Sequence, residues 1–398
     1  MARPSPCSPG GSGRRPATGS CATRTTPRCA WTATSRSSTS RWPRPASGAT
    51  AWWSTRCIRR IPGSGSDAPG APPARPVAPA PVPRVEQALM RFGLHLPQLG
   101  RSAGLEHIVR IARRAEELGF DDVWVADHVA VPTGLAGMPS FFPEPVPLLS
   151  AAAAHTNRVG LGTSVLVAAY RNPMQFAKQW ATLDWLSGGR TILGVGAGWL
   201  EAEFAACGVP MRRRGQRLDD YIAGWRAAWA GAESYTSEHF SFTDVRVKPA
   251  PAGPAPIWIG GSSPGALRRA ARCEGWMGTW APREVFAERL AELRAHEQDA
   301  AAPTIASIHM EMRLGPPLNR GGRWSEVGDG YGDRPVAAGT VPQLAELLAG
   351  YIDAGLQHVL IVPLARSEAE WAAHVDAAAE LKSLLGSGDR PGGCEDRG

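Results

Sequence analysis

Two residues that could carry out acid–base chemistry, Asp127 and His128, stand together directly after a short apolar run. Residues 123–126 read Val-Trp-Val-Ala, which is typical of a buried strand. Because histidine titrates near neutral pH, His128 could give or take a proton at the end of that strand. The pair could equally cap a turn after the strand. The surrounding elements must decide between these two interpretations.

A second stretch, IGGSSPGALRR, has the pattern of an anion site. Gly260 and Gly261 follow an expected strand, and a helix is expected to begin near Pro264. Backbone N–H groups at a helix start attract a phosphate, and glycines allow it to come close. Gly278 and Thr279, which end the next expected strand, would contact the same group. The alternative is a plain turn between strand and helix.

The hydrophobic periodicity predicts eight strand–helix units after Met90. For example, apolar residues recur at helical spacing over residues 105–118, and Gly119 ends that helix. The expected strands are residues 91–96, 122–126, 158–166, 191–195, 257–259, 276–279, 305–313 and 358–362. The expected helices are residues 105–118, 147–155, 173–186, 215–229, 264–273, 283–298, 341–353 and 367–385. Residues 239–249 alternate like a hairpin strand, and residues 316–339 are expected to form a polar, Gly-rich loop.

This alternation predicts an α/β protein with a (β/α)₈ TIM barrel and insertions, because eight units over about 300 residues fit that fold. The competing architecture is an open, doubly wound sheet. Residues 194–199, GVGAGW, resemble a dinucleotide fingerprint, but the spacing is G-x-G-x-G and no acidic residue ends a strand about 20 residues later. The active site of a barrel lies at the carboxyl ends of its strands. Asp127 and His128 are therefore expected on the catalytic rim.

The charge of the chain is unevenly distributed. The whole sequence has 43 basic and 36 acidic residues, which gives a formal net charge of +7. Residues 1–89 contain 13 arginines, no lysine and two acidic residues, so residues 90–398 contain 30 basic and 34 acidic residues. The basic character therefore belongs to the first 89 residues. The remainder gives no electrostatic reason to expect a nucleic-acid partner.

The first 89 residues are expected to be a disordered leader, because Pro, Ser, Thr, Arg and Gly dominate them and cannot form a core. Their composition is also that of GC-rich DNA read in an untranslated frame, and Met90 is the expected natural start. A single globular domain is predicted over residues 90–386, with a disordered tail over residues 387–398. No stretch is long and apolar enough to span a membrane, and the cysteines lack metal-ligand spacing, so we expect a cytoplasmic protein with no metal site.

Three stretches resemble the luciferase-like monooxygenase superfamily, and specifically its single-chain branch that uses coenzyme F420. The most specific is residues 161–210, with the ordered motifs TSV, RNP, AKQ, ATLD, LSGGR and GVGAGW. VWVADHV precedes it and IWIGGSSPGALRRAARCEGW follows it, in the order of the family. The resemblance is strong over residues 90–270 and weaker in the last third of the chain.

The resemblance assigns roles to the matching positions. It implies a non-prolyl cis peptide at Ser164–Val165, lying against the ring of the cofactor. It places His128 beside the reactive carbon of the deazaflavin, as the group that handles the proton of the substrate. Asp127 matches a residue near the ring edge, and two roles are open for it: orienting His128, or accepting a hydrogen bond from the ring.

The chain departs from the sugar-phosphate dehydrogenase of this branch after the fourth expected strand. Trp199 stands where that enzyme has a catalytic glutamate, which puts a sugar-phosphate substrate in doubt. Glu201 and Glu203 follow on an expected helix, where Glu203 could simply be solvated. Trp199 and Glu201 are candidates for the substrate pocket. A flat hydrophobic substrate is favoured by the aromatic residues expected on the rim: Phe141, Phe142, Tyr170 and Trp199.

The leading hypothesis is an oxidoreductase that transfers a hydride between coenzyme F420 and an organic substrate. The first alternative is an FMN-dependent monooxygenase of the same superfamily, which would need reduced flavin and dioxygen. The second alternative is a non-catalytic barrel that binds flavin. A small-molecule substrate is the expected partner, and the resemblance is compatible with a homodimer.

Overall fold

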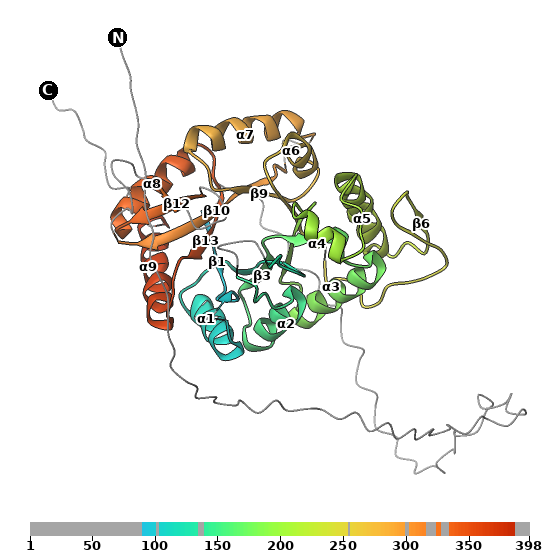
Figure 1. The fold of residues 1–398 in the computed structure, drawn as a ribbon, viewed down its shortest axis with the longest axis horizontal. Helices are drawn as coiled ribbons and strands as arrows, with labels where there is room; N and C mark the ends of the chain where they lie inside the picture. Colours follow the sequence, from blue (N-terminus) through green and yellow to red (C-terminus); the bar gives the residue numbers. More distant parts are fainter. Residues whose placement is uncertain are drawn as a thin grey trace, which may run out of the picture. The chain divides into compact units, whose positions relative to one another are not determined.

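The computed structural model describes most of the chain from Met90 to Gly386 (Figure 1). The described residues are 90–100, 103–133, 139–253, 255–298, 302–315, 324–327 and 334–386. The expected leader and tail, residues 1–89 and 387–398, lie outside them. Within the described part of the chain, no helix is both long and apolar enough to cross a membrane.

Eight parallel strands form a closed barrel at the centre of the described residues (Figure 1). Their order around the barrel is β1–β2–β3–β5–β8–β9–β10–β13, and β13 pairs with β1 to close it. They are β1 (Arg91–His95), β2 (Asp122–Val125), β3 (Gly160–Thr163), β5 (Thr191–Gly196), β8 (Ile257–Gly260), β9 (Gly275–Thr279), β10 (Ile305–Leu314) and β13 (His358–Pro363). The predicted (β/α)₈ barrel is therefore confirmed. The open sheet is wrong, because an open sheet would leave two free edges.

Helices follow the strands and surround the barrel (Figure 1). They are α1 (Leu105–Glu117), α2 (Pro145–His155), α3 (Pro173–Ser187), α4 (Glu201–Ala206), α5 (Arg214–Trp229), α6 (Pro264–Ala270), α7 (Arg283–His296), α8 (Val341–Asp353) and α9 (Glu368–Gly386). Local chemistry sets their ends. At the start of α3, the side chain of Asn172 accepts a hydrogen bond from the backbone N–H of Gln175. At its end, Gly188 adopts a left-handed φ of 71°.

Tryptophan side chains and glycines share the middle of the barrel. The indoles of Trp124 and Trp258 are buried, with ring centroids 5.3 Å apart. A Cβ added at Gly162 or Gly275 would lie only 2.2–2.4 Å from these rings, so the directly paired strands β3 and β9 need glycine there. The apolar layer that fills the middle consists of Trp124, Ile192, Trp258, Met277 and Leu360. Polar groups above this layer, at the mouth, are therefore separated from those below it.

The third expected strand is divided. Instead of one strand over residues 158–166, the chain forms β3 and then β4 (Leu166–Val167). The peptide bond between Ser164 and Val165, which lies between the two strands, is cis. Both short strands pair with β5, so the bulge stays within the barrel wall.

The insertions are partly as expected. The hairpin is present as β6 (Tyr235–Thr236) and β7 (Ser241–Phe242). The prediction of a polar loop over residues 316–339 is wrong in part, because it contains β11 (Trp324–Val327) and β12 (Arg334–Gly339). These strands pair with each other, and β12 also pairs with the end of β10. They are short and surrounded by Gly and Asp, so they carry too little periodicity to be detected from the sequence.

Candidate active site

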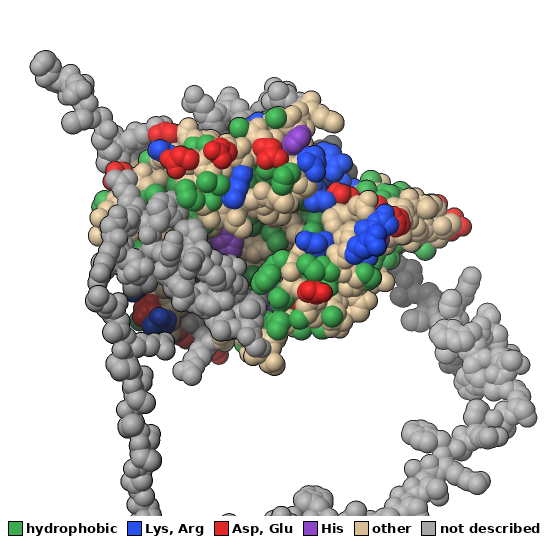
Figure 2. Space-filling view, turned by 45° about the horizontal axis from the view of Figure 1, so that its top comes forward, with side chains coloured by type: hydrophobic (Ala, Val, Ile, Leu, Met, Phe, Trp, Pro, Cys, Tyr) green, Lys and Arg blue, Asp and Glu red, His purple; other side chains and the backbone are tan. Residues whose placement is uncertain are grey.

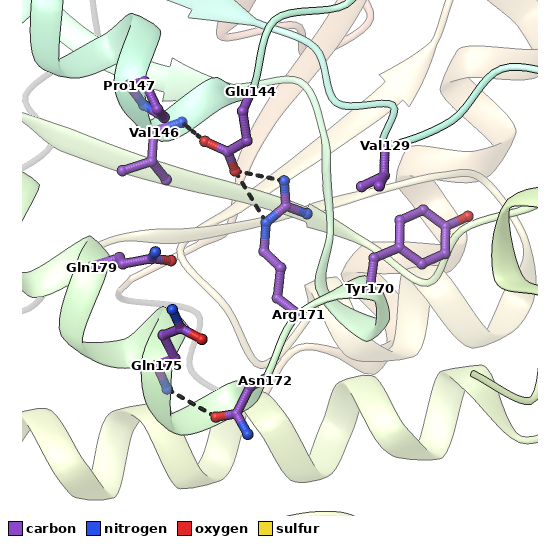
Figure 3. Close-up of a pocket in the computed structure, with 9 residues that line it drawn as sticks. All are labelled: Val129, Glu144, Val146, Pro147, Tyr170, Arg171, Asn172, Gln175 and Gln179. Atoms are coloured by element: carbon purple, nitrogen blue, oxygen red, sulfur yellow. Dashed lines mark hydrogen bonds and ion pairs between the residues drawn. The ribbon is translucent and has the colours of Figure 1, made fainter. Parts of the chain in front are cut away.

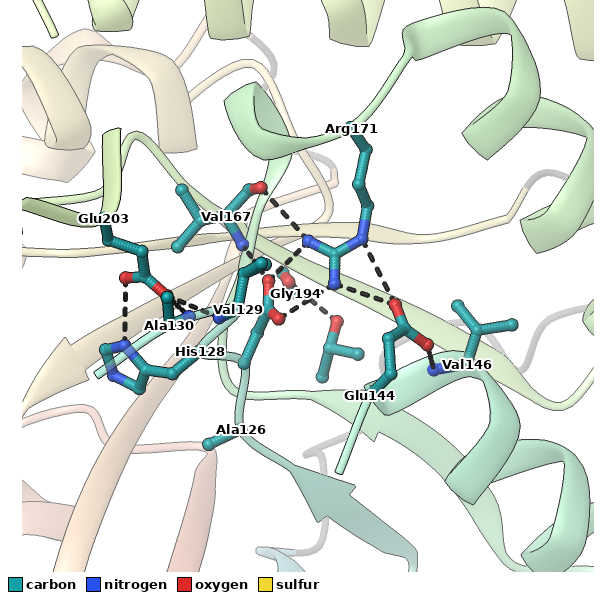
Figure 4. A network of polar contacts seen from close by, with 12 residues as sticks. Ala126, His128, Val129, Ala130, Glu144, Val146, Val167, Arg171, Gly194 and Glu203 are labelled. Carbon is teal, nitrogen blue, oxygen red and sulfur yellow. Dashed lines mark hydrogen bonds and ion pairs between the residues drawn. The ribbon is translucent and has the colours of Figure 1, made fainter. Parts of the chain in front are cut away.

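His128 lies just beyond the carboxyl end of β2, at the mouth of the barrel. Its Nδ1 is 3.1 Å from a carboxylate oxygen of Glu203. Because an ionised carboxylate can only accept, Nδ1 donates, and Nε2 lies on the side of the ring away from Glu203 (Figure 4). The side chain of His128 is 13% exposed, whereas that of Glu203 is 1% exposed. One ring nitrogen is thus fixed by a buried carboxylate, while the other is left for a ligand.

Glu203 comes from α4, the short helix that follows β5. Its second oxygen accepts hydrogen bonds from the backbone N–H groups of Val129 and Ala130 (Figure 4). Burial disfavours the charged carboxylate, but the hydrogen bonds from His128 and from these two N–H groups outweigh it, so the pKa of Glu203 lies below its usual value. The interpretation of Glu203 as a solvated residue is therefore wrong. The sequence indicates that Glu201 and Glu203 face different sides, because positions two apart on a helix do so. In the structure, Glu201 is the exposed one.

Asp127 does not contact His128. Its two oxygens accept hydrogen bonds from the guanidinium of Arg171, at 2.6 and 2.8 Å, and from the backbone N–H of Val167, at 2.9 Å. Glu144 binds the same guanidinium at 2.8 Å, so Arg171 joins two carboxylates (Figure 4). The role of orienting His128 is therefore wrong for Asp127 and belongs to Glu203. A hydrogen bond from Asp127 to a ring stays a prediction.

The Ser164–Val165 bulge borders the same mouth. The side chain of Val165 is directed at the neighbouring strands, since a Cβ added at Gly196 or Gly260 would lie 2.8 or 2.6 Å from it. The Oγ of Ser164 is buried and has no hydrogen-bond partner among the described residues. The bulge thus combines an apolar wall with a polar atom that has no partner in the described part of the chain.

The expected phosphate site is only partly assembled. Gly260 ends β8, and Gly261 follows with a φ of +107°, which side-chain-bearing residues rarely adopt. On the neighbouring strand the exposed Thr279 places its Oγ1 3.5 Å from the Oγ of Ser262. Gly278, by contrast, is buried, and a Cβ there would meet the indole of Trp276. Gly260, Gly261 and Thr279 thus lie at adjoining strand ends, whereas Gly278 could contribute only through its backbone.

Aromatic side chains flank His128. The ring of Phe142 meets the imidazole edge-on at a centroid distance of 4.9 Å, and that of Trp199 does so at 6.4 Å. Trp199 is 53% exposed, so it is available to a ligand. The space-filling view shows a hollow with a histidine and apolar side chains along its edge (Figure 2). Glu201 is exposed and has no polar contact with His128 within the described residues.

A separate cavity of about 470 Å³ lies beside the mouth (Figure 3). It is lined by Val129, Glu144, Val146, Pro147, Tyr170, Arg171, Asn172, Gln175 and Gln179. Tyr170 lines this cavity and packs edge-on against Phe204 at 4.9 Å. The cavity does not include His128, Ser164 or Gly260.

Two histidines that the sequence analysis did not single out, His95 and His309, also face the barrel interior. Their rings stack with centroids 6.3 Å apart and planes inclined by 22°. His95 is the last residue of β1, and His309 pairs in register with Thr279 on β9. A signal was available for His95, because a polar residue at the end of an otherwise buried strand points to the catalytic face of a barrel.

Comparison with known proteins agrees with this architecture. Residues 89–310 match the family described as luciferase-like monooxygenase. An F420-dependent glucose-6-phosphate dehydrogenase of Amycolatopsis mediterranei is 31% identical over 226 residues, which cover 53% of this chain and 65% of that enzyme. An uncharacterized protein of Mycobacterium tuberculosis is 33% identical over 266 residues, which cover 60% of this chain and 92% of that protein.

Solved structures share the fold at lower identity. The monooxygenase RslO1 from Streptomyces bottropensis has a TM-score of 0.61 and 22% identity, covering 73% of this chain and 98% of that one. An F420-dependent secondary alcohol dehydrogenase in complex with an F420-acetone adduct has a TM-score of 0.61 and 16% identity, with the same coverage. At these identities the two structures show the shared fold alone. Since the family match covers more than half of its length, the chain belongs to the luciferase-like monooxygenase family.

Proposed function

We propose that this protein is an oxidoreductase that transfers a hydride between coenzyme F420 and an organic substrate. The observation that carries the proposal is the His128–Glu203 pair, which stands at the barrel mouth with one imidazole nitrogen turned away from the buried carboxylate. Relatives at about 31–35% identity that are named F420-dependent support the choice of cofactor.

The residues at the mouth fit a flat ring with a phosphate-bearing tail. Ser164 supplies a buried hydroxyl without a partner among the described residues, and Val165 supplies an apolar surface backed by glycines. Gly260 and Gly261, which lack side chains, would let a phosphate come close to the hydroxyl of Thr279, and Gly278 would contribute its backbone, while the N–H of Gly261 is itself donated to the carbonyl oxygen of Met277. These residues are the proposed cofactor contacts. FMN shares both chemical features, so it is the alternative ligand.

A bound deazaflavin supplies or accepts the hydride. The protein must handle the proton that accompanies it, because oxidation of an alcohol removes a hydride from carbon and a proton from oxygen. His128 would take that proton at Nε2 while Nδ1–H stays hydrogen-bonded to Glu203. The buried negative charge of Glu203 would stabilise the imidazolium that forms. The reverse reaction returns the same proton from Nε2 to the substrate oxygen.

The substrate is proposed to be apolar rather than a sugar phosphate. Trp199 is half exposed beside His128, and Phe142 covers another edge of the imidazole. An aromatic face stabilises a bound apolar ligand through buried area and ring packing. A phosphate group, by contrast, would need cationic or N–H donors at this position.

Dependence on dioxygen separates the proposal from its first alternative. The purified protein would be mixed with F420 and a panel of aromatic and alicyclic alcohols under anaerobic conditions, with the deazaflavin absorbance followed over time. We expect substrate-dependent reduction that does not change when dioxygen is admitted. Turnover only with reduced FMN and dioxygen would instead make the protein a monooxygenase. Tight cofactor binding with no turnover in either assay would favour the non-catalytic barrel.

A further inference from the structure

His95 and His309 face the barrel interior by strand alternation. On β1, Arg91 bonds to the interior residue Asp122, and a Cβ at Gly93 would meet the side chains of Asp122 and Trp124, so His95 faces inward with them. On β10, the same alternation places His309 on the face of Ser307. That serine bonds to His358 inside the barrel. Two imidazoles from strands on either side of β13 thus meet at the mouth.

The ring of His95 has a fixed tautomer. Its Nδ1 lies 2.9 Å from the backbone carbonyl oxygen of Leu96, which can only accept, so Nδ1 carries the hydrogen. Burial lowers the pKa of His95 to about 4, which outweighs the opposing effect of this hydrogen bond. The imidazole is therefore neutral at physiological pH, and Nε2 carries a lone pair.

The lone pair on Nε2 of His95 has no donor among the residues that the structure describes. The residue is 3% exposed, and no hydrogen bond joins Nε2 to any residue in the part of the chain that the structure describes. A polar atom at the mouth of the barrel that has no partner among the described residues is available to a donor on a ligand. The hydrogen bond from Nδ1 to the carbonyl oxygen of Leu96 holds the imidazole in this orientation, so the direction of the lone pair is held.

We propose that His95 is a ligand-contacting residue that selects an N–H or O–H donor and holds it by a hydrogen bond to Nε2. This inference rests on the proposed function only in assuming that the mouth binds a cofactor and a substrate. The donor has two sources: the ring imide N–H that F420 and FMN share, or the hydroxyl of a substrate. His95 acts as an acceptor, whereas His128 exchanges protons.

Two variants test the proposal by binding measurements on the full chain. His95→Phe removes the acceptor and keeps a ring, while His95→Asn keeps an acceptor oxygen. His107→Phe is the matched control, because His107 is another buried histidine, on α1 and outside the barrel. Each protein would be titrated with F420 and FMN alone, and then with benzyl alcohol and benzyl methyl ether, which differ only in the hydroxyl donor.

We expect His95→Phe to weaken binding roughly tenfold, in line with one hydrogen bond, and His95→Asn to recover part of the loss. A loss for F420 and FMN identifies the cofactor imide as the donor, and a loss for benzyl alcohol but not its ether identifies the substrate hydroxyl. In the wild type, the ¹⁵N resonance of His95 Nε2 should shift when that ligand is added. The proposal is overturned if folded His95→Phe binds every probe within twofold of wild type and the resonance does not move. Tight FMN binding without F420 binding would contradict the proposed function. The effect of His95→Phe on FMN binding could still be measured in that case.

Discussion

Among the described residues, one histidine–carboxylate pair lies at each end of the barrel. At the mouth, His128 bonds to Glu203 at 3.1 Å. At the opposite end, Nε2 of His358 bonds to Asp122 at 2.9 Å, and Ser307 bonds to the other ring nitrogen at 2.6 Å. The residue types and distances are alike. Ser307, His358 and Asp122 even have the composition of a hydrolytic triad.

The two pairs differ in solvent exposure. Asp122, His358 and Ser307 are 0% exposed, and the apolar layer around Trp124 and Trp258 lies between them and the mouth. His128 keeps 13% of its side chain exposed. In barrels, residues at the carboxyl end of the strands serve chemistry and those at the amino end serve stability. The same pair of side chains is therefore expected to give catalysis in one place and stability in the other.

Substitution of His128 at the mouth should reduce turnover more than any other change considered below. His128→Ala should lower kcat by about 10²–10⁴-fold, the usual contribution of a positioned acid–base group, and change the Kd for F420 only a few-fold. His155→Ala, on the exposed end of α2, should leave both unchanged. Equal losses in kcat and cofactor affinity would mean that His128 is a binding or structural residue. If His128→Ala retains turnover, His128 only caps the turn after β2.

Substitution in the buried Asp122–His358 pair should lower the stability of the fold rather than the rate of turnover. Asp122→Ala leaves His358 and Arg91 without their partner, so the free energy of unfolding should fall by about 3–5 kcal/mol in urea denaturation. Turnover per folded molecule should stay within a few-fold. Asp376→Ala, which removes an exposed ion pair to Arg114, should cost under about 1 kcal/mol. If Asp122→Ala is as stable as wild type but loses turnover, the buried pair serves catalysis rather than stability.

Glu203→Gln should weaken catalysis without removing the acid–base group. A glutamine has one carbonyl oxygen, which cannot accept from His128 and from the backbone of Val129 and Ala130 in the present geometry. We expect kcat to fall roughly 10- to 100-fold, below the full contribution of His128, with little change in cofactor Kd. The pH dependence of kcat should also shift, because the imidazolium of His128 loses the negative charge of Glu203. An unshifted profile would assign Glu203 a purely structural role.

The smallest expected effect is a change in acid stability. Burial raises the pKa of Asp122, but contacts with His358, Arg91 and Trp124 outweigh it and hold the pKa below the ordinary value. A depressed carboxyl pKa stabilises the fold above the unfolded-state pKa, and the contribution is lost as the pH falls through the folded-state pKa. The unfolding free energy of wild type should therefore fall more steeply below about pH 4 than that of Asp122→Asn. Parallel curves would contradict the assigned charge state.

The fold was largely predictable from the sequence, because long periodic segments define strand and helix independently of tertiary contacts. The pairing within the site was not. Asp127 is adjacent to His128 in sequence, yet its carboxylate turns to Arg171, while Glu203 reaches the imidazole from 75 residues away. Adjacent residues after a strand point in different directions, so sequence proximity favoured the wrong partner. The His95–His309 stack also depends on the closure of the barrel, which brings β1 and β10 to either side of β13.

We expect coenzyme F420 to bind at the mouth of this barrel. The most direct measurement is a fluorescence titration of the protein with F420 and with FMN under the same conditions. We expect the lower Kd for F420, and a higher Kd for F420 when the apolar wall is shortened in Val165→Ala. FMN binding at least tenfold tighter than F420, equivalent to about 1.4 kcal/mol, would show that F420 is not the cofactor.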